Sequence, residues 1–388
     1  MFQLKESDLK KRGAEITTRE IKQQPSLWQE TWRNFEKRAE ESKAFLERLE
    51  KKHAALRIIF TGAGTSAYVG DMILPHLKGE NEMKERIFEA IPTTNLVSNP
   101  AQYFQADFPT LLVSFARSGN SPESIAAVEL GKKCVQDFYQ ITITCAKDGK
   151  LARSAEEDEN HLLLLMPEKA NDQGFAMTGS FTCMALTALL LFDTFSSKNH
   201  AKWVREIVEM GEQVIQKESF LQELVDLDFE RIVYLGSGSL AGLAREAQLK
   251  ILELTAGKIA TLFDSSMGFR HGPKSFVNQD TLVIDFVSND AYTKQYDVDI
   301  ISELREDEVA KGVCAISASK LQDAHRTDFD FGGLGNDLPD AYLALPFVMI
   351  AQTLALLTAV RVSNLPDTPS PSGTVNRVVK GVTIHSFN

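Results

Sequence analysis

Short runs of β-branched and aromatic residues alternate along the chain with longer segments of helical periodicity. The runs 57–60, 111–115, 140–144 and 161–166 are almost continuously apolar, which is typical of strands buried on both faces. Helical segments lie between most of them, and the strongly apolar stretch 182–195 follows the last. This alternation predicts an α/β fold with a parallel sheet that helices cover on both faces.

The same order of elements occurs twice in the chain. R-I-I-F-T-G-A-G at 57–64 aligns with R-I-V-Y-L-G-S-G at 231–238, an offset of 174 residues. T-L-L-V-S-F at 110–115 matches T-L-V-I-D-F at 281–286 at almost the same offset, and 313–317 parallels the third strand. Two βα turns and their following strands that agree in order and spacing indicate two copies of one α/β domain.

The segments outside the two repeats complete the predicted organisation. Residues 17–50 carry apolar positions at helical spacing among charges, and 200–224 reads as a helical connection between the domains. The predicted division is an N-terminal helical segment at 1–50, a first domain at 51–199, a second domain at 200–365 and a C-terminal tail at 366–388.

One apolar run, 341–362, is long enough to cross a bilayer. Pro346, Gln352 and Arg361 interrupt this run, and it stands alone near the end of a chain of ordinary globular composition. We therefore expect a buried core helix and no membrane partner. The charged N-terminus has no apolar core behind it, so no signal peptide is expected and the predicted location is cytoplasmic.

Composition narrows the function. The chain of 388 residues has 53 acidic and 42 basic residues, a net charge of −11, which argues against nucleic acid or an anionic membrane as its main partner. The four cysteines lie far apart without a C-x-x-C pair and are expected to be reduced thiols. The seven histidines form no H-x-H or H-E-x-x-H pair, so no metal is expected.

The first strand leads into the turn T-G-A-G-T-S at 61–66. Gly62 and Gly64 after a strand suggest a dinucleotide site, but Ala67 stands where the third glycine would be, and no acidic residue is placed to hold a ribose. NAD binding is therefore the less favoured interpretation, and no cofactor is expected. Thr65 and Ser66 instead place two hydroxyls at the start of a helix.

The second strand leads into A-R-S-G-N-S-P-E-S at 116–124. Ser118 and Ser121 can donate O–H bonds, and a helix start offers N–H groups and a positive dipole end, which suits a phosphate monoester. A plain helix N-cap would use the same residue types, so the motif alone favours neither a phosphate site nor a helix cap. The matching loop at 287–291 has lost the glycine and gained an acid, so we expect one phosphate site, in the first domain.

The second domain carries charged groups of a different kind. Glu246, Lys250 and Glu253 are spaced four and three residues apart on one helical face. A solvated salt-bridge face is the simplest interpretation, but the helix is otherwise apolar, which predicts that these charges lie in a cleft. In G-F-R-H-G-P-K-S at 268–275, His271 is a candidate acid–base group, although a lone histidine is more often structural.

Together these motifs resemble those of tandem sugar isomerase (SIS) domain proteins that isomerise phosphosugars. They are similar to the isomerase half of glucosamine-6-phosphate synthase and more closely to the bacterial galactosamine-6-phosphate deaminase/isomerase family. The tail sequence V-V-K-G-V at 378–382 adds to the resemblance, which covers nearly the whole chain beyond residue 15. The resemblance implies two flavodoxin-like, three-layer αβα SIS domains, with active sites between domains and shared between the subunits of a homodimer or higher homo-oligomer.

The resemblance also implies roles for particular residues. A phosphosugar would be bound by Gly64, Thr65, Ser66, Arg117 (through its backbone), Ser118, Asn120 and Ser121. Glu253 matches the carboxylate that moves a proton between C1 and C2, and His271 the histidine that opens the sugar ring from the neighbouring subunit. Lys380 matches the lysine that engages the open-chain sugar, and Lys250 a helix lysine near the reacting carbons.

One segment departs from the synthase pattern. Where the synthase has V-A-S-T-K, this chain has F-A-M-T-G at 175–179, and no amidotransferase domain is present. We therefore expect a deaminase/isomerase that converts galactosamine 6-phosphate to tagatose 6-phosphate and ammonia. The alternatives are a phosphosugar isomerase without deamination and, in a different class, a non-catalytic phosphosugar sensor.

Overall fold

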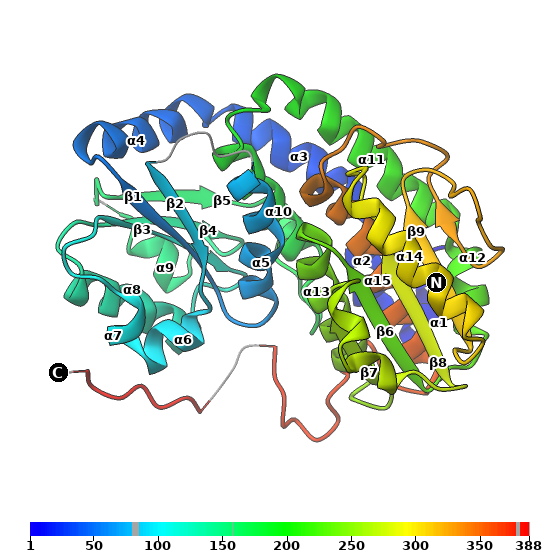
Figure 1. Cartoon of the computed structure of the whole chain (residues 1–388). Helices are drawn as coiled ribbons and strands as arrows, with labels where there is room; N and C mark the ends of the chain where they lie inside the picture. Colours follow the sequence, from blue (N-terminus) through cyan, green and yellow to red (C-terminus); the bar gives the residue numbers. More distant parts are fainter. Residues whose placement is uncertain (80–84, 157, 378–380, 388) are drawn as a thin grey trace. The chain divides into compact units, whose positions relative to one another are not determined.

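The computed structural model describes residues 1–79, 85–156, 158–377 and 381–387. Across these residues two parallel five-stranded sheets are present (Figure 1). The strands of the first sheet are β1 Leu56–Thr61, β2 Arg86–Ala90, β3 Thr110–Ala116, β4 Phe138–Thr144 and β5 His161–Leu165. Those of the second are β6 Arg231–Gly236, β7 Ala260–Asp264, β8 Thr281–Phe286, β9 Gly312–Ser317 and β10 Phe329–Asp330.

The two sheets share one strand order. The first runs β2-β1-β3-β4-β5 and the second β10-β9-β8-β6-β7, which is the same order when each sheet is numbered from its own first strand. This is the flavodoxin-like order of a doubly wound α/β sheet. The predicted fold class is therefore confirmed.

The sequence pattern found the central strands and the edge strand β5, and it missed three other strands. β2 and β7 lie at sheet edges, and β10, also an edge strand, is only two residues long. In β2 the side chain of Ile87 is 41% exposed, and β7 has no buried residue, so neither strand has the continuous apolar run of a central strand.

The expected helical region 17–50 is also divided, because the chain turns at Gln23 and again at 37–38. Its helices, with the one before them, are α1 Glu6–Lys11, α2 Glu15–Lys22, α3 Gln24–Glu36 and α4 Ala39–Lys52.

The chain folds into two compact units, each built on one sheet and each made of three separate segments. The first-sheet unit contains Leu27–Asp172, Gly179–Lys198 and Val375–Asn388. The second-sheet unit contains Met1–Ser26, Gln173–Thr178 and Asn199–Thr374. The last residues of the chain therefore belong to the first-sheet unit.

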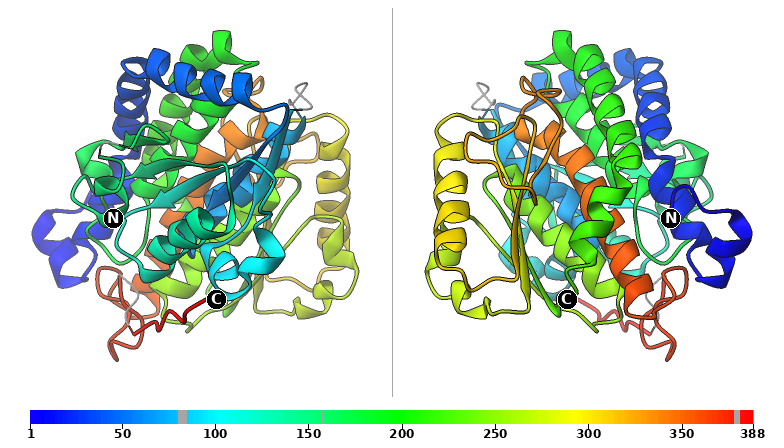
Figure 2. Two further views of the ribbon diagram at one scale, coloured as in Figure 1. Left: turned by 90° about the vertical axis from the view of Figure 1, so that its left-hand side faces the viewer. Right: turned by 90° about the vertical axis from the view of Figure 1, so that its right-hand side faces the viewer.

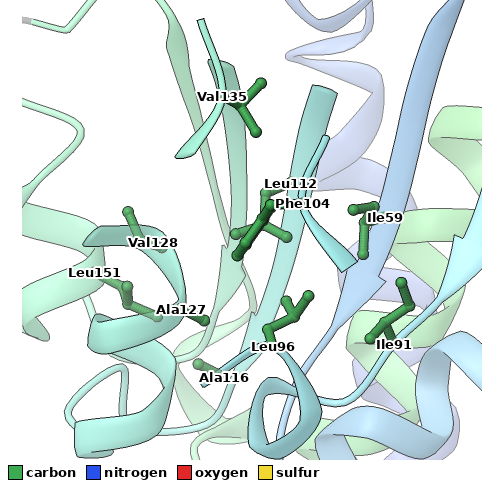
Figure 3. Packing of buried hydrophobic residues seen from close by; sticks show 10 residues of the cluster. All are labelled: Ile59, Ile91, Leu96, Phe104, Leu112, Ala116, Ala127, Val128, Val135 and Leu151. Carbon is green, nitrogen blue, oxygen red and sulfur yellow. The ribbon is translucent and has the colours of Figure 1, made fainter. Parts of the chain in front are cut away.

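Helices cover both faces of the first sheet. On one face lie α5 Thr65–Gly79 and α10 Gly179–Phe192, where Phe60 of β1 meets Phe192 edge-on at 5.3 Å. On the other face Ile59 and Leu112 pack with Leu96 and Ala127 in the cluster of Figure 3. The helices of that face are α6 Thr93–Ser98, α7 Pro100–Tyr103, α8 Pro122–Cys134 and α9 Lys150–Arg153. Each such aliphatic side chain contributes about 1.5–3 kcal/mol by its burial.

The second sheet is likewise a central layer. Figure 2 shows α14 Thr293–Glu306 on one side of it and α15 Asp340–Arg361 on the other. Helix α13 Ser239–Leu254 packs on α15, as do α11 His200–Gln216 and α12 Glu218–Val225. Short 3-10 turns, η3 Gly268–Arg270 and η4 Pro273–Phe276, lie on the α14 side, since Phe269 packs in one cluster with Ile300 of α14.

Helix α15 is the apolar run for which a core helix was expected. Among the described residues it alone has the length and hydropathy to cross a bilayer, and 94% of its apolar window is buried inside the protein. The prediction of a buried core helix is confirmed. Phe347 of this helix stacks 6.0 Å from Phe286 of β8, so the helix is part of the core of the second-sheet unit.

A buried acid pair lies at the carboxyl end of the second sheet. Asp285 of β8 and Asp297 of α14 are both fully buried. Burial, and then the neighbouring charge of Asp297, raise the pKa of Asp285 well above its ordinary value, against a smaller opposing effect of a hydrogen bond from Ser266. The native protein therefore holds a proton at Asp285 that the unfolded chain releases above about pH 4.

This proton makes stability depend on pH in a defined direction. Because the native state binds more protons, the free energy of unfolding should fall as pH rises from about 4 towards the raised pKa of Asp285. Asp285→Asn keeps a neutral group and removes that dependence, so its melting temperature relative to wild type should increase steadily between pH 5 and 8. Asp299→Asn, an exposed acid on α14, is the matched control and should leave the pH profile unchanged. Parallel profiles for wild type and Asp285→Asn would show that Asp285 is ionised in the fold.

Candidate active site

The ends of two neighbouring strands set the position of the candidate phosphate site. Thr61 at the end of β1 pairs with Ser114 of β3, so the loops that follow these strands lie side by side. From β1 the chain goes to β2 on one side, and from β3 it goes to β4 on the other. Ligands of doubly wound sheets bind in the crevice outside the carboxyl ends of strands at such a reversal of strand order.

The first of these loops is a tight glycine turn. A Cβ atom on Gly62 would lie 2.5 Å from the backbone carbon of Ser66, so a larger residue there would displace the start of α5. Gly64 has φ +56°, in the left-handed region that glycine adopts without strain. The turn brings Thr65 and Ser66 into the first turn of α5, with their side chains largely buried. Three of the expected phosphate-site residues, Gly64, Thr65 and Ser66, thus lie in one rigid turn.

The second loop follows β3 and is held against the start of α9. Gly119 has φ +63°, and its carbonyl accepts a hydrogen bond from the Leu151 amide at 3.1 Å. The side-chain oxygen of Asn120 accepts one from the Lys150 amide, also at 3.1 Å. The hydroxyl of Ser118 accepts from the Asn120 amide at 3.3 Å. These contacts fix the backbone of the loop beside the glycine turn.

Ser121 distinguishes between a phosphate loop and a plain helix cap. It occupies the N-cap position of α8, yet within the described chain its side chain makes no capping hydrogen bond to the helix. Its hydroxyl lies 3.4 Å from that of Ser124. Because an N-cap serine contributes through a bond to a backbone amide, this geometry favours the ligand interpretation.

Arg117 has a contact that the sequence did not predict. Its side chain is largely buried, and its Nη2 donates to the carbonyl oxygen of Arg377 at 2.7 Å. The guanidinium of Arg117 therefore holds the C-terminal tail within the first-sheet unit. Lys380, the tail residue expected to engage the sugar, lies outside the described residues.

The charges on α13 do not form a solvated face. Glu246 and Lys250 are fully buried, and Glu253 keeps 22% of its side chain exposed. Lys250 Nζ lies 3.3 Å from Glu246 Oε1 and 2.6 Å from Glu253 Oε2. Burial lowers the pKa of Lys250, but the two carboxylates more than offset it, so the pKa lies above its usual value. Lys250 is therefore a cation, and the exposed part of Glu253 is what a substrate can reach.

His271 lies in a firmly anchored loop of the second-sheet unit. It is exposed between η3 and η4, next to Gly272 with φ +120°. Arg270 donates to Glu303 of α14 at 2.7 Å, and Lys274 pairs with the same carboxylate and with Asp307. The loop thus presents the imidazole to the outside of its own unit on a fixed backbone.

The second sheet separates His271 from Glu253 within one chain. The His271 loop packs on the α14 side, through Phe269, whereas α13 with Glu253 packs on the α15 side. The two groups are thus attached to opposite faces of the second sheet. The structure therefore brings together Glu246, Lys250 and Glu253, and it attaches the His271 loop to the other face of the sheet.

Sequence reasoning missed two residues that support these loops. Asp172 is fully buried, and its carboxylate accepts hydrogen bonds from the Gly179 and Ser180 amides at 3.2 and 2.9 Å, at the start of α10. Arg377 donates from Nε to the Asp172 carbonyl at 3.0 Å. Six residues lie between Asp172 and the first residue of α10, so no local sequence pattern reveals that Asp172 caps this helix. Among the described residues, no three His, Cys, Asp or Glu side chains gather where they could hold a metal ion.

The role of the two serines can be tested through stability and affinity together. Ser121→Ala and Ser118→Ala should leave the melting temperature nearly unchanged, because neither hydroxyl caps a helix. Each should weaken phosphosugar binding about tenfold or more, since a hydrogen bond to a charged group contributes roughly 1.5–3 kcal/mol. Titration calorimetry and KM measure the second effect. A drop in melting temperature with unchanged phosphosugar affinity would show that the serines cap a helix and do not bind phosphate.

The sequence and the fold of this chain are both similar to those of known proteins. Residues 52–192 match the family model of the SIS domain. The chain is 45% identical over 381 residues to the D-galactosamine-6-phosphate deaminase AgaS of Escherichia coli, with 96% of each chain covered. The crystal structure of the tagatose-6-phosphate ketose/aldose isomerase from Escherichia coli matches with a TM-score of 0.87 at 41% identity, over 96% of both chains. That of a Clostridium novyi NT protein matches with a TM-score of 0.95 at 42% identity, over 100% of this chain and 99% of the other. At these identities over almost its full length, the chain belongs to the SIS-domain family of the galactosamine-6-phosphate deaminase AgaS.

Proposed function

We propose that this protein is a cytoplasmic amino-sugar-phosphate deaminase/isomerase that converts galactosamine 6-phosphate to tagatose 6-phosphate and ammonia. One observation carries the proposal: a partly exposed carboxylate, Glu253, is held 2.6 Å from a buried cationic lysine in a chain 45% identical to a galactosamine-6-phosphate deaminase. A non-catalytic sensor has no need for such a carboxylate. The enzyme interpretation is therefore preferred.

The substrate phosphate would be held by the two loops of the first-sheet unit. The start of α5 at Thr65 and that of α8 after Ser121 offer backbone N–H groups and positive dipole ends. The serine and threonine hydroxyls add donors without adding net charge, which suits a protein of net charge −11. The contributing residues are Gly64, Thr65, Ser66, Ser118, Asn120 and Ser121, with the backbone of Arg117.

The proton chemistry would be carried by Glu253 and His271. His271 protonates the ring oxygen, which opens the sugar to its aldehyde form. Glu253 then removes the proton at C2 and returns it at C1, while the C1 oxygen takes up a proton and the C2 amine becomes an imine. Water adds to this imine, and ammonia leaves, so the C2 ketone of tagatose 6-phosphate remains. The sequence of steps needs no change in overall oxidation level.

Lys250 would act through Glu253 in this scheme. Its side chain is completely buried, and its Nζ contacts Glu253 and Glu246. It is therefore a positioning residue, which fixes the carboxylate of Glu253. A protonated Lys250 cannot accept the C2 proton, and Glu246 is as deeply buried as the lysine, so Glu253 is the preferred base. Lys380 remains the proposed contact to the open-chain sugar.

A second copy of the chain would supply the histidine. Because Glu253 and His271 of one copy are attached to opposite faces of the second sheet, the proposal takes the histidine from a neighbouring subunit of a homodimer or higher homo-oligomer. Exposed apolar side chains support this, because Phe263 on the edge strand β7 is 37% exposed and Met267, four residues before His271, is 46% exposed. Such side chains next to an edge strand are suited to burial against a partner.

The substrate assignment can be tested by ammonia release. Purified protein is supplied in turn with galactosamine, glucosamine and N-acetylgalactosamine 6-phosphates, and the ammonia formed is measured. We expect rapid release from the galacto amine and little from the other two. Equal release from the gluco and galacto amines would refute the substrate assignment. Interconversion of tagatose and galactose 6-phosphates without any ammonia from the amines would establish the simple isomerase, which the name of the Escherichia coli structural relative favours.

The roles of the two catalytic residues predict distinct kinetic defects. Glu253→Gln keeps the size of the side chain but cannot accept a proton, so kcat should fall at least ~10²-fold while substrate still binds. Exchange of the C2 proton with solvent measures the step directly, and exchange at the wild-type rate would exclude Glu253 as the base. His271→Asn should lose activity on the cyclic sugar, yet an open-chain analogue should still react.

Mixing the same two variants tests the shared site. Co-expressed Glu253→Gln and His271→Asn chains can pair an intact carboxylate with an intact histidine only across a subunit interface. We expect such mixed oligomers to recover a measurable fraction of wild-type activity, whereas each variant alone stays inactive. No recovery in mixed oligomers of proven composition would mean that both residues act within one chain.

A further inference from the structure

The C-terminal tail is held within the first-sheet unit at two separate points. Arg117 donates to the carbonyl oxygen of Arg377 at 2.7 Å. Ten residues further along, Lys133 at the end of α8 contacts the Phe387 carbonyl, with its Nζ 5.7 Å from the centre of the Phe387 ring. The two anchors differ in kind, because the first comes from the candidate phosphate loop and the second from a surface lysine of a helix end.

At the first anchor, Arg377 is bound through both its backbone carbonyl and its side chain. While Arg117 binds its carbonyl, the guanidinium of Arg377 donates to the Asp172 carbonyl and, at 3.3 Å, to the side-chain oxygen of Asn171. These partners belong to a rigid support, since the carboxylate of Asp172 is bound by the first amides of α10 and by the Ser180 hydroxyl at 2.5 Å. Arg377 is therefore held in one position, because the residues that bind it are themselves fixed by the start of α10.

Arg117 stands immediately before Ser118 in the same loop. Its side chain is 7% exposed, so its guanidinium is desolvated and its contact to the tail is not a loose surface interaction. A displacement of the 118–121 backbone would also displace the guanidinium that holds Arg377. The loop and the tail are thus joined through one buried side chain.

We propose that Arg117 is a positioning residue that couples the phosphate loop to the C-terminal tail through Arg377. Phosphate in the loop favours the docked tail, and the docked tail favours bound phosphate, by the same factor in each direction. The proposal rests on the proposed function, because it takes the 118–121 loop as the phosphate site. It assigns the guanidinium of Arg117 to the tail and leaves phosphate contact to the backbone and the hydroxyls.

Hydrogen exchange of the tail tests the coupling with inorganic phosphate as the probe. In the wild type, phosphate at saturation should slow exchange in a peptide covering 375–387 several-fold. In Arg117→Met, phosphate should bind about tenfold more weakly and, at concentrations raised to restore saturation, should leave exchange in the tail unchanged. Working at saturation in each protein separates a loss of coupling from a loss of affinity.

Two further variants make the test specific. Arg377→Met leaves every residue of the phosphate loop in place, yet by reciprocity it should weaken phosphate binding by about the same tenfold factor. The Arg117→Met/Arg377→Met double variant should bind no more weakly than either single variant, because both remove one coupling. Lys133→Met, which removes only the distal anchor, is the matched control and should leave phosphate affinity and the protection of 375–377 unchanged.

The outcomes distinguish this inference from the function on which it rests. Equal phosphate protection of the tail in wild type and Arg117→Met, or additive losses in the double variant, would overturn the coupling and leave the phosphate site intact. Failure of phosphate and of galactosamine 6-phosphate to bind the wild type would overturn the phosphate site itself, and the coupling with it. Catalytic assays of Arg117→Met add a further check. If the tail positions groups for the reaction, the variant should have a lower kcat as well as a higher KM.

Discussion

The order of strands in each parallel sheet is the constraint on which the rest of this structure depends. Placing β1 and β3 side by side, with the chain leaving in opposite directions, brings two loops and two helix starts to one edge. Neither loop alone offers more than a few hydroxyls and amides. Their adjacency follows from the topology of the sheet, and it is the basis of the phosphate site proposed for this protein of net charge −11.

The second sheet has the same order but uses the equivalent edge differently. Ser237, which follows β6, donates its hydroxyl to Asp297 at 2.6 Å, and the Ser288 amide after β8 donates to the other oxygen of that carboxylate at 3.0 Å. At this edge of the second sheet, the carboxylate of Asp297 thus accepts hydrogen bonds from both loops. The acid of the second loop is Asp290, which accepts hydrogen bonds from the amide and hydroxyl of Thr293 at 2.8 and 2.9 Å. The candidate catalytic groups of this unit lie instead on α13 and on the His271 loop.

The sequence-based predictions were accurate for features that depend on neighbouring residues in the chain, and they failed for features that depend on contacts between residues far apart in the sequence. Central strands and the core helix α15 were predictable, because burial on all sides leaves a continuous apolar signal in the local sequence. The edge strand β5 was also predictable, because three of its five residues are buried. The edge strands β2 and β7 were not, because their more exposed positions admit Ile87, Glu89 and Phe263 without a regular apolar pattern. The face shared by Glu246, Lys250 and Glu253 followed from helical spacing, but the burial of Glu246 and Lys250 and the packing of the His271 loop on the α14 side depend on tertiary structure. The bond from Arg117 to Arg377 joins residues 260 positions apart and leaves no local trace.

The discontinuous make-up of the units has a consequence for how the protein is made. The first-sheet unit needs Val375–Asn388, which the ribosome adds only after the whole second-sheet unit has been synthesised. Domains generally fold as they emerge, at about 5–20 residues per second, so the first sheet has tens of seconds in which to form without its final segment. The nascent chain can therefore complete both sheets well before Arg117 meets its tail partner. The anchoring of Arg377 by Arg117 is thereby separated in time from the formation of the two sheets.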